Sequence, residues 1–485
     1  MSAPRPAEAS LPSTDAEIPI SADLAVHALA QLPDSVNVEI ASSDDVARAM
    51  VVARAYGVDN RIDVRLSAGD GKHRPSARFS LDGVARPYGP GSFASLLHDI
   101  GSTTPTPTRR GDDRVLAGAR IAVITNQPAH YRIPLFNGLA ERLGAVDASL
   151  RVYFLERTPT ARPWLEGQRP AAFDHEYLSS VALPVRRHRR PSVPSRLGSE
   201  LAGFQPTIIL AAGLSPFVAG RAARFARNAG VSIGVWSGEI GQAPTARGRV
   251  RRAVRRQILC GVDFAIVYGW KSAQYLHQLA PSLPVVIGRN SSSIPARILG
   301  SRIPLQPTLV AVGDLASNRK GMDVLIDALS LTPHLQCELR LIGGGRLLPE
   351  LAASARTDPR VTVLGPLGAA ETRAEMSRSD VYLFPTRFDL FGLSLVEAMG
   401  CGLASVVTRC SGAVEDLCAP DVNCLRVDSH EPEEWAGAIT RLSDHAGLRA
   451  SLGHDAAATV AARWTMDHAV DAMMAGLRLG VKPTR

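Results

Sequence analysis

The sequence predicts an α/β protein with two Rossmann-like, doubly wound domains facing a cleft and a small α/β extension at the N-terminus. Two series of short, β-branched apolar segments predict this fold, because buried parallel strands are continuous apolar runs separated by helical stretches. The first series lies at 121–125, 207–211, 231–236, 264–268 and 284–287. The second series lies at 308–312, 338–342, 361–364, 381–384 and 404–408. A stretch rich in Ser and Pro, near 290–304, separates the two series, and this places the domain boundary there.

The same patterns predict the organisation of the whole chain. We expect a disordered tail over 1–20, the extension over 21–101, a linker over 102–116, the two Rossmann-like domains over 117–300 and 301–465, and a C-terminal helix over 466–485 that packs back on the first domain. The extension is predicted to contain strands near 36–40 and 61–66 and a helix over 45–56. Because no Gly-rich loop follows its first strand, we interpret the extension as a structural or docking element.

Composition narrows the class of protein. The chain of 485 residues has a formal charge of +8 and an isoelectric point near 9.4, which favours sugar nucleotides, anionic membranes or nucleic acid as partners. Nucleic acid is the poorest candidate, since no recognition helix or aromatic-interleaved basic strand accompanies the charge. The six cysteines form no C-x-x-C pair, so we expect reduced thiols and no structural zinc. No apolar run approaches the ~18 residues of a membrane span and no signal-peptide pattern begins the chain, so we expect a cytoplasmic protein.

Two carboxylates, Asp389 and Glu397, stand eight positions apart around the turn Phe391-Gly392-Leu393. The turn follows a predicted strand and opens an apolar helix, and the junction of a strand end with a helix N-terminus is where α/β sheets bind anions. The free amides of Phe391, Gly392 and Leu393 would point at a phosphate. Glu397, about two turns into the helix, would be a buried carboxylate that needs donors, which the hydroxyls of a ribose or hexose supply.

This stretch resembles the signature of the family-4 retaining glycosyltransferases, the group 1 glycosyl transferases with the GT-B fold, in which two acids frame seven residues. The resemblance extends over residues 120 to about 470. It implies that the first acid, Asp389, touches the donor sugar and that the second, Glu397, holds the nucleotide ribose. The family usually has glutamate at the first position, so Asp389 is one methylene shorter. The plain alternative is a buried helix whose acid caps a backbone group.

The loop from Gly313 to Met322 resembles the Gly-Arg-Leu…Lys-Gly loop of the family, whose arginine and lysine clamp the diphosphate. Lys320 matches the lysine, but Asp314 stands where the family has arginine, and a carboxylate repels a diphosphate. Three explanations are open: Arg319 supplies the missing charge, Asp314 turns away to bind the acceptor or its own backbone, or donor binding has been weakened or lost. A surface role for Lys320 is the plain alternative.

Further donor-binding candidates follow other strands of the second series. The glycines 343–345 would let a nucleotide approach the backbone closely, and Gly344 is the central one; a purely structural turn is equally consistent with this pattern. Leu364, followed by Gly365, resembles the segment of the family that reads the nucleobase. Gly313 opens the loop that contains Lys320 and completes the predicted donor site.

The predicted acceptor site lies in the first domain. The loop that follows its first strand closely resembles the opening of bacterial members of the family that modify polysaccharides and related acceptors. We predict acceptor contacts from Asn126, Tyr131 and Arg132, and catalytic roles for His130 and Glu239. The alternative to a catalytic role for His130 is a packing role. Glu239 could also be an acceptor contact.

Six arginines fall on a predicted helix in the segment from Arg247 to Arg256. Their i,i+4 pairs share a face, and Val250, Val254, Ile258 and Leu259 are expected to line another. Such a basic amphipathic helix can rest on an anionic membrane surface, although a solvated face is equally consistent. A second basic cluster lies at 186–190.

The resemblance implies a retaining glycosyltransferase that moves a hexosyl group from a nucleotide sugar to a glycan or lipid-linked acceptor in the synthesis of cell-envelope glycan, polysaccharide or glycolipid. No D-x-D pair occurs in the sequence, so we expect no metal and no cofactor, with Lys320 and helix amides stabilising the leaving diphosphate. The location would be cytoplasmic or peripheral on the inner membrane face. The alternative is a non-catalytic GT-B protein that binds a glycan or a partner.

Overall fold

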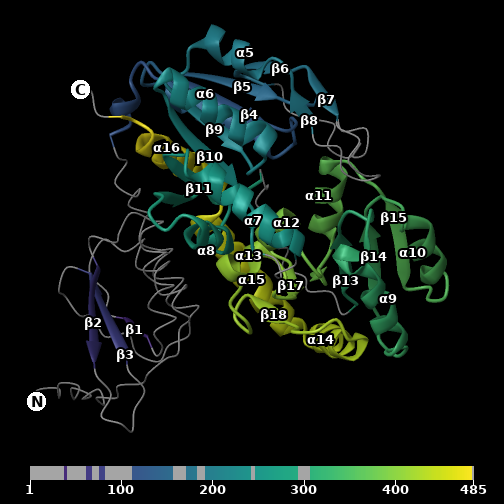
Figure 1. Ribbon diagram of the computed structural model, residues 1–485. Helices are drawn as coiled ribbons and strands as arrows, with labels where there is room; N and C mark the ends of the chain where they lie inside the picture. The colour runs from purple at the N-terminus through teal and green to yellow at the C-terminus, as the bar shows by residue number, and fades with distance from the viewer. Residues whose placement is uncertain are drawn as a thin grey trace, which may run out of the picture.

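The computed structural model describes residues 112–156, 171–182, 192–241, 246–292 and 306–482, together with three short strands near the N-terminus. Two parallel sheets form two lobes, and the helices near the middle of the chain lie between them (Figure 1). The predicted tail, the predicted helix over 45–56, residues 102–111 of the predicted linker and the basic cluster at 186–190 lie outside the described residues.

The first lobe is built on a parallel sheet with the strand order β12-β11-β10-β9-β4-β5-β6. Its strands are β4 (Arg120–Thr125), β5 (Ser149–Phe154), β6 (Asp174–Tyr177), β9 (Ile208–Ala212), β10 (Ser232–Ser237), β11 (Phe264–Val267) and β12 (Val285–Ile287). Successive strands are added on one side from β4 to β6 and on the other side from β9 to β12. The order therefore reverses between β4 and β9, which is the doubly wound arrangement that the sequence predicts.

The second lobe repeats this plan with the strand order β15-β14-β13-β16-β17-β18. Its strands are β13 (Thr308–Val312), β14 (Glu338–Ile342), β15 (Val361–Gly365), β16 (Val381–Phe384), β17 (Ala404–Val407) and β18 (Cys424–Arg426). The order reverses between β13 and β16. Open α/β sheets bind ligands outside the carboxyl ends of the strands at such a reversal, so the loops after β13 and β16 form the expected ligand edge.

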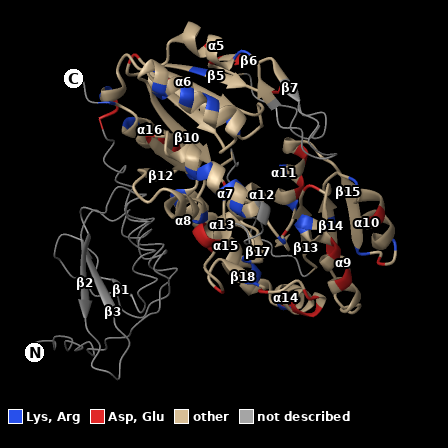
Figure 2. Ribbon diagram, in the orientation of Figure 1, with Lys and Arg blue, Asp and Glu red and all other residues tan. Residues whose placement is uncertain are grey.

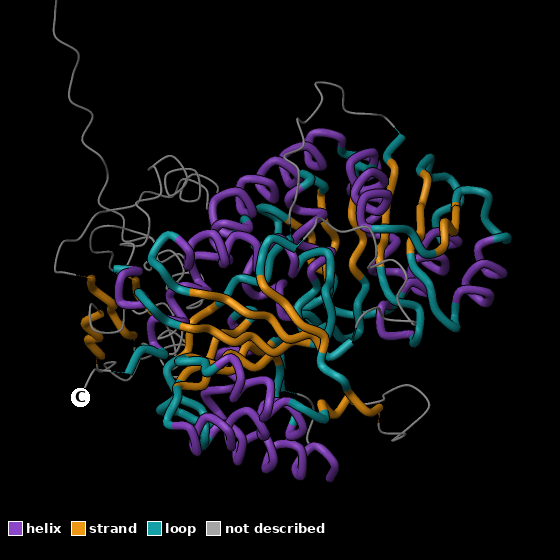
Figure 3. The backbone as a smooth tube through the Cα atoms, turned by 90° about the horizontal axis from the view of Figure 1, so that it is seen from above, coloured by secondary structure: helices purple, strands orange, loops and turns teal. Residues whose placement is uncertain are grey.

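Helices cover both faces of each sheet (Figure 3). Those of the first lobe are η2 (Asp113–Leu116), α4 (Arg132–Gly144), α5 (Leu197–Phe204), η4 (Pro216–Gly220), α6 (Arg221–Ala229), α7 (Ala246–Leu259) and α8 (Trp270–Leu279). Those of the second are η5 (Asn318–Lys320), α9 (Met322–Ser330), α10 (Leu348–Ala355), α11 (Ala369–Arg378), α12 (Leu393–Gly400), α13 (Gly412–Leu417), α14 (Pro432–Asp444) and α15 (Ala446–Arg463).

The apolar strands are buried on both faces. Along β4, Ile121 and Val123 enter one hydrophobic core while Ala122 and Ile124 enter the other. Because both faces of the sheet are covered, the inner positions of β4 are apolar without a break, and this is why the strand is visible in the sequence as a continuous run.

The last helix, α16 (Met466–Leu479), belongs to the first lobe. Val470, Met473 and Met474 of α16 lie in the same hydrophobic core as β4 and β11. The chain therefore crosses between the lobes twice, after β12 and between α15 and α16. The two crossings are joined, because the indole of Trp464 donates to the carbonyl of Asn290 at 3.2 Å.

Two smaller sheets complete the described elements. β7 (Ser180–Ala182) pairs with β8 (Ser192–Pro194) in an antiparallel hairpin at the edge of the first lobe. Near the N-terminus, β1 (Val38–Ile40), β2 (Ile62–Ser67) and β3 (Ser76–Leu81) form an antiparallel sheet with the order β1-β3-β2. The sequence predicts β1 and β2 of this sheet but not β3.

Basic residues recur along the helix α7 (Figure 2). Ile258 and Leu259 are buried, whereas Val250 and Val254 are 66% and 39% exposed. The predicted apolar face is therefore buried at its C-terminal end, and its two valines are exposed. Between the valines and this end, Arg255 is buried, and its guanidinium donates to the hydroxyl of Tyr275 at 2.9 Å.

Candidate functional site

The carboxyl ends of β13 and β14 are held together by glycine contacts. A Cβ on Gly343 would lie 1.9 Å from the carbonyl oxygen of Gly313, and a Cβ on Gly345 would lie 2.3 Å from the amide nitrogen of Ala316. The carbonyl of Gly344 accepts from the amide of Leu315 at 2.9 Å. Glycine is therefore required here for the close packing of two loops, which is the structural role that the sequence left open for residues 343–345.

Lys320 ends the short 3₁₀ turn η5 directly after β13. Gly321 follows it with a φ of +67°, and a Cβ there would lie 2.0 Å from the carbonyl oxygen of Pro385 in the loop after β16. The Lys320 ammonium lies 2.5 Å from Oδ2 of Asp389 and 5.6 Å from the centre of the Phe384 ring. Both charged side chains are less than one-fifth exposed. The predicted diphosphate cation and the first acid of the motif thus meet at the reversal point of the sheet.

The neighbouring charges answer part of the question raised by Asp314. Its Oδ1 accepts from the amide of Ala316 at 2.8 Å, so this carboxylate holds its own loop, one of the three explanations left open. Arg387, after β16, makes a bidentate pair with Asp323 at 2.8 and 2.9 Å. The side chain of Arg319 makes no hydrogen bond or ion pair with any described residue, and it is the cation nearest in sequence that can supplement Lys320.

The helix that opens the predicted motif, α12, begins at Leu393 because Gly392 before it has a φ of +96°. Glu397 is the fifth residue of this helix, just over one turn in, so the prediction of two turns is wrong. The amide of Phe391 donates to Oδ1 of Asp389 at 3.4 Å, whereas the amides of Gly392 and Leu393 make no hydrogen bond to a described residue. Two of the three predicted amides are therefore available to an anion.

Glu397 is 7% exposed and meets residues of the first lobe. Its Oε1 accepts from the hydroxyl of Ser292 at 2.7 Å and lies 3.5 Å from Nε2 of His130. The hydroxyl of Tyr382, on β16, donates to Ser394 at 2.8 Å. Burial raises the pKa of Tyr382, and the charges of Glu397 and Asp389 add to this shift, so both acids act on one buried phenol. A carboxylate with one oxygen engaged retains lone pairs for ligand hydroxyls.

Ser292 was not among the predicted site residues. It follows β12, within the stretch that the sequence identifies only as a boundary, and the residues from Arg289 to Ser292 are all buried. The run of four polar residues was the only local signal in the sequence that this segment has a polar role. It could not identify the partner of Ser292, which is 105 positions away. His130, predicted to have a catalytic role in the loop that borders the acceptor, lies beside the acid predicted to hold the ribose.

Arg132, a predicted acceptor contact, is buried inside the first lobe. Its guanidinium donates to the hydroxyl of Thr125 and, at 3.5 Å, to that of Tyr268, and it lies 5.2 Å from the ring centre of Trp236. Arg132 is 7% exposed. Arg132 therefore holds the carboxyl ends of β4, β10 and β11 together, which is a structural role in the first lobe.

Three other predicted residues of the first lobe have different environments. Oε2 of Glu239 forms an ion pair with Arg255 at 2.6 Å, and the Glu239 side chain is partly exposed. Asn126 is exposed at the end of β4, and its carbonyl accepts from the amides of Leu155 and Glu156 at 3.0 and 2.9 Å. Tyr131 is half-buried and meets His130 edge-on, with ring centres 5.3 Å apart.

Leu364, the predicted base-binding residue, is the last residue but one of β15 and is half-buried. The carbonyl of the adjacent Gly365 accepts from the amide of Gly343 at 2.9 Å. The end of β15 is therefore continuous with the glycine loops after β13 and β14, on the same edge of the sheet as Lys320.

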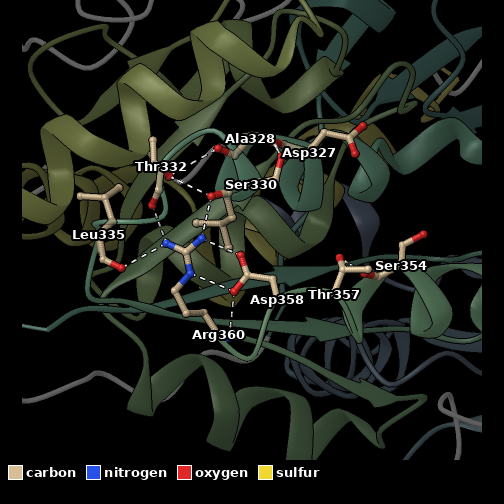
Figure 4. A network of polar contacts seen from close by, with 10 residues as sticks. Asp327, Ala328, Ser330, Thr332, Leu335, Ser354, Thr357, Asp358 and Arg360 are labelled. Carbon is tan, nitrogen blue, oxygen red and sulfur yellow. Dashed lines mark hydrogen bonds and ion pairs between the residues drawn. The ribbon is translucent and has the colours of Figure 1, made fainter.

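The opposite edge of this sheet carries a structural network. Arg360 pairs with Asp358 at 2.5 Å and donates to the carbonyls of Thr332, Leu335 and Leu329 at 2.6, 3.1 and 2.6 Å (Figure 4). A cavity of about 450 Å³ beside it is lined by the first residues of β13 and β14. Ligands of α/β sheets bind at carboxyl ends, so this cavity at the amino ends is not the candidate site.

Within the described ranges, no group of three or more His, Cys, Asp or Glu side chains is arranged to hold a metal ion. None of the helices in the described part of the chain is both long and apolar enough to span a bilayer. These observations leave the predicted absence of a metal as an expectation.

The second lobe matches a known family. Residues 306–445 match the family described as "Glycosyl transferases group 1", a range that includes Lys320, Asp389 and Glu397. The resemblance predicted from the motifs is thus confirmed.

Particular relatives match over part of their length. A D-inositol 3-phosphate glycosyltransferase of Xylanimonas cellulosilytica is 32% identical over 181 residues, which are 36% of this chain and 42% of that protein. One of Mycolicibacterium vanbaalenii is 29% identical over 255 residues, 47% of this chain and 55% of that protein. The chain thus spans about half the length, or less, of these curated relatives.

Solved structures match over most of the chain. The Anabaena protein Alr3699/HepE in complex with UDP and glucose has a TM-score of 0.58 at 17% identity, covering 74% of this chain and 99% of that one. The lipopolysaccharide outer core galactosyltransferase WaaB has a TM-score of 0.57 at 15% identity, covering 74% and 99%. The two sheets with flanking helices are therefore the GT-B fold that the sequence predicts.

Proposed function

We propose that this protein is a glycosyltransferase that transfers a hexosyl group from a nucleotide sugar to a hydroxyl acceptor. The observation that carries the proposal is the contact of Lys320 with Asp389 at the carboxyl edge of the second sheet, where its strand order reverses, together with the buried Glu397 in the helix that begins there. The family match over this lobe supports it. So does the similarity of fold to a protein whose structure holds UDP and glucose.

In the proposed mechanism, each group acts on a different part of the donor. Lys320, with the amides of Gly392 and Leu393, neutralises the charge that develops on the leaving diphosphate, the stabilisation that such transfers need most. The free oxygen of Glu397 accepts from the ribose hydroxyls. Asp389 lies next to the diphosphate cation, within reach of the sugar attached there. We further propose that the transfer retains the anomeric configuration and needs no metal ion or cofactor, as the family resemblance implies.

The proposed acceptor is a glycan or lipid-linked hydroxyl of the cell envelope that enters from the first lobe. The loop after β4 supports this, because it places His130 beside Glu397 and leaves Asn126 exposed at the strand end.

We also propose that α7 rests on an anionic membrane surface, since exposed Val250 and Val254 lie among exposed arginines. A flotation assay with anionic vesicles tests this: Val250→Asp should reduce binding, the Arg224→Glu variant on α6 should not, and equal binding by both would refute it.

Nucleotide release tests the enzymatic proposal. UDP-, GDP- and ADP-sugars are each incubated with the wild type, with Glu397→Gln and with Glu350→Gln, an exposed acid on α10 that serves as a control. At least one donor should be turned over by the wild type and the control, and Glu397→Gln should be slower by roughly 10- to 100-fold because one ligand hydrogen bond is weakened. Equal rates in all three proteins would refute the assigned role of Glu397.

A non-catalytic GT-B protein is the second candidate. One observation favours it: the pairing of Lys320 with Asp389 partly neutralises the cation that a donor needs. A thermal-shift series with the same nucleotide sugars separates the two functions. Stabilisation by a donor without turnover, or by a glycan alone, would favour the binding protein.

A further inference from the structure

The N-terminus of α8, in the first lobe, is capped by a carboxylate of the second lobe. The amide of Trp270, the first residue of α8, donates to both oxygens of Asp416 in α13, at 3.0 and 3.1 Å. Asp416 is 7% exposed. A carboxylate at a helix N-terminus satisfies an amide that lacks an intrahelical partner and complements the helix dipole. This cap is unusual in that the helix and the carboxylate belong to different domains, 146 residues apart.

The residue before α8 fits this contact. A Cβ on Gly269 would lie 2.0 Å from Oδ2 of Asp416 and 3.1 Å from the ring of Phe391. Glycine therefore lets Asp416 approach the helix end, and any side chain would push α13 away. The contact between Asp416 and the start of α8 therefore requires glycine at position 269.

The second residue of α8 strengthens the same junction. The ammonium of Lys271 donates to the carbonyls of Arg409 and Ser411 at 2.7 and 3.1 Å and lies 3.5 Å from Oε1 of Glu415. The Lys271 and Glu415 side chains are 24% and 20% exposed. The first turn of α8 thus binds the segment from 409 to 416 through two donors, the amide of Trp270 and the ammonium of Lys271.

That segment is bonded directly to the loop of the donor motif. The amide of Ala413 donates to the carbonyl of Phe391 at 2.7 Å, and the hydroxyl of Ser411 donates to the same carbonyl. The amide of Asp389 donates to the carbonyl of Cys410 at 2.9 Å. From the other lobe, the ring of Tyr268, two residues before α8, meets the ring of Phe391 edge-on at 6.2 Å. The N-terminus of α8 is therefore two contacts away from Asp389.

We propose that Asp416 and Lys271 are positioning residues for sugar transfer. They hold α8 of the acceptor lobe onto the segment that supports Asp389, so that closure of the lobes and the placement of Asp389 depend on one junction. This inference rests on the proposed function and adds to it the residues that couple the two lobes. Neither side chain lies at the predicted diphosphate or ribose contacts, so each acts through the loop it supports.

The test uses the full chain with Asp416→Ala, Asp416→Asn and Lys271→Met. Lys482→Met is a matched control, because Lys482 also donates to two carbonyls, those of Gly230 and Val231, but within the first lobe. We expect kcat to fall by about tenfold or more in Asp416→Ala and Lys271→Met, because small misplacements of catalytic groups have effects of this size. Asp416→Asn retains a carbonyl that accepts from Trp270 and should recover part of kcat. The control should match the wild type.

Two measurements separate positioning from a loss of folded protein. Small-angle scattering should show a larger radius of gyration for Asp416→Ala and Lys271→Met, and hydrogen exchange at the Trp270 amide should become faster in Asp416→Ala. Kd for the nucleoside diphosphate should change by less than about threefold, since Lys320 and Glu397 are untouched. An unchanged kcat per folded molecule, or unchanged scattering and exchange, would overturn the proposal.

Failure of the proposed function has a different signature. If the wild type transfers sugar from no donor, the enzymatic role fails and the positioning role fails with it. Scattering and exchange do not depend on activity, so they still decide whether the junction itself holds the lobes together.

Discussion

The ion pair between Lys320 and Asp389 leads to a prediction in which two effects have opposite signs. Its atoms lie 2.5 Å apart, and the side chains are 12% and 17% exposed. If Lys320 is the diphosphate cation, Asp389 competes with the ligand for it in the empty site. Asp389→Asn should therefore tighten the binding of a nucleoside diphosphate while it slows sugar transfer.

The geometry sets the size of the effect. Unit charges about 3 Å apart at an effective dielectric of ~20 attract by about 5 kcal/mol, and desolvation offsets most of that attraction in a largely buried pair. A net competition of about 1 kcal/mol corresponds to roughly fivefold in Kd. Lys320→Met removes a charge-assisted contact of about 2 kcal/mol instead and should weaken binding by roughly 30-fold.

Calorimetric titration measures both effects, with the nucleoside diphosphate that gives the largest thermal shift. Asp428→Asn, an exposed acid that follows β18, is the control. Nucleotide release then supplies kcat, which should fall in both Asp389→Asn and Lys320→Met. The reasoning would be refuted if Asp389→Asn weakened nucleotide binding as much as Lys320→Met does, because Asp389 would then support the ligand and not compete with it.

Three further predictions concern the ribose contact and stability. Ser292→Ala removes the 2.7 Å hydrogen bond to Glu397 and should change the free energy of nucleotide binding by about 1 kcal/mol, or Kd by roughly fivefold, measured by calorimetry; an unchanged Kd would contradict the assigned contact. Arg360→Ala leaves Asp358 and several carbonyls without their donor and should lower the free energy of unfolding by about 3 kcal/mol in urea denaturation, with Kd for the nucleotide unchanged. Burial lowers the pKa of His468 from 6.5 to about 4, so the unfolded chain binds the extra proton first; the stabilisation is complete above about pH 6.5 and is lost as the pH falls towards 4, by about 2 kcal/mol after allowance for partial exposure. His468→Gln should show a shallower decline in urea denaturation between those pH values, and an identical decline would contradict this origin.

Most strands that are buried on both faces could be predicted almost to the residue, although β5, with Val152, Tyr153 and Phe154 fully buried, was missed. β13, β14 and β16 begin and end where the sequence places them. β13 and β16 are almost wholly apolar, whereas Glu338 and Arg340 alternate with apolar residues in β14. β6 was missed because it is an edge strand whose sequence, Asp174 to Tyr177, is polar and mostly exposed. Its pairing with β5 depends on tertiary contacts that leave no local pattern.

The candidate site was only partly predictable. Asp389 and Glu397 share one short motif, so their spacing is visible in the sequence, and Lys320 stands in a second motif. Ser292 is 105 positions from its partner, and no periodic pattern connects residues so far apart. The orientation of Asp314 depends on a hydrogen bond within its own loop, which only coordinates reveal.

The most direct test of the central claim is a crystal structure of the full chain with a bound nucleoside diphosphate. We predict that the diphosphate oxygens lie about 3 Å from the Lys320 ammonium, that the ribose hydroxyls lie at the free oxygen of Glu397, and that the contact between Lys320 and Asp389 is broken. A nucleotide found in the cavity beside Arg360, or a bound nucleotide with Lys320 still paired to Asp389, would contradict the proposed site.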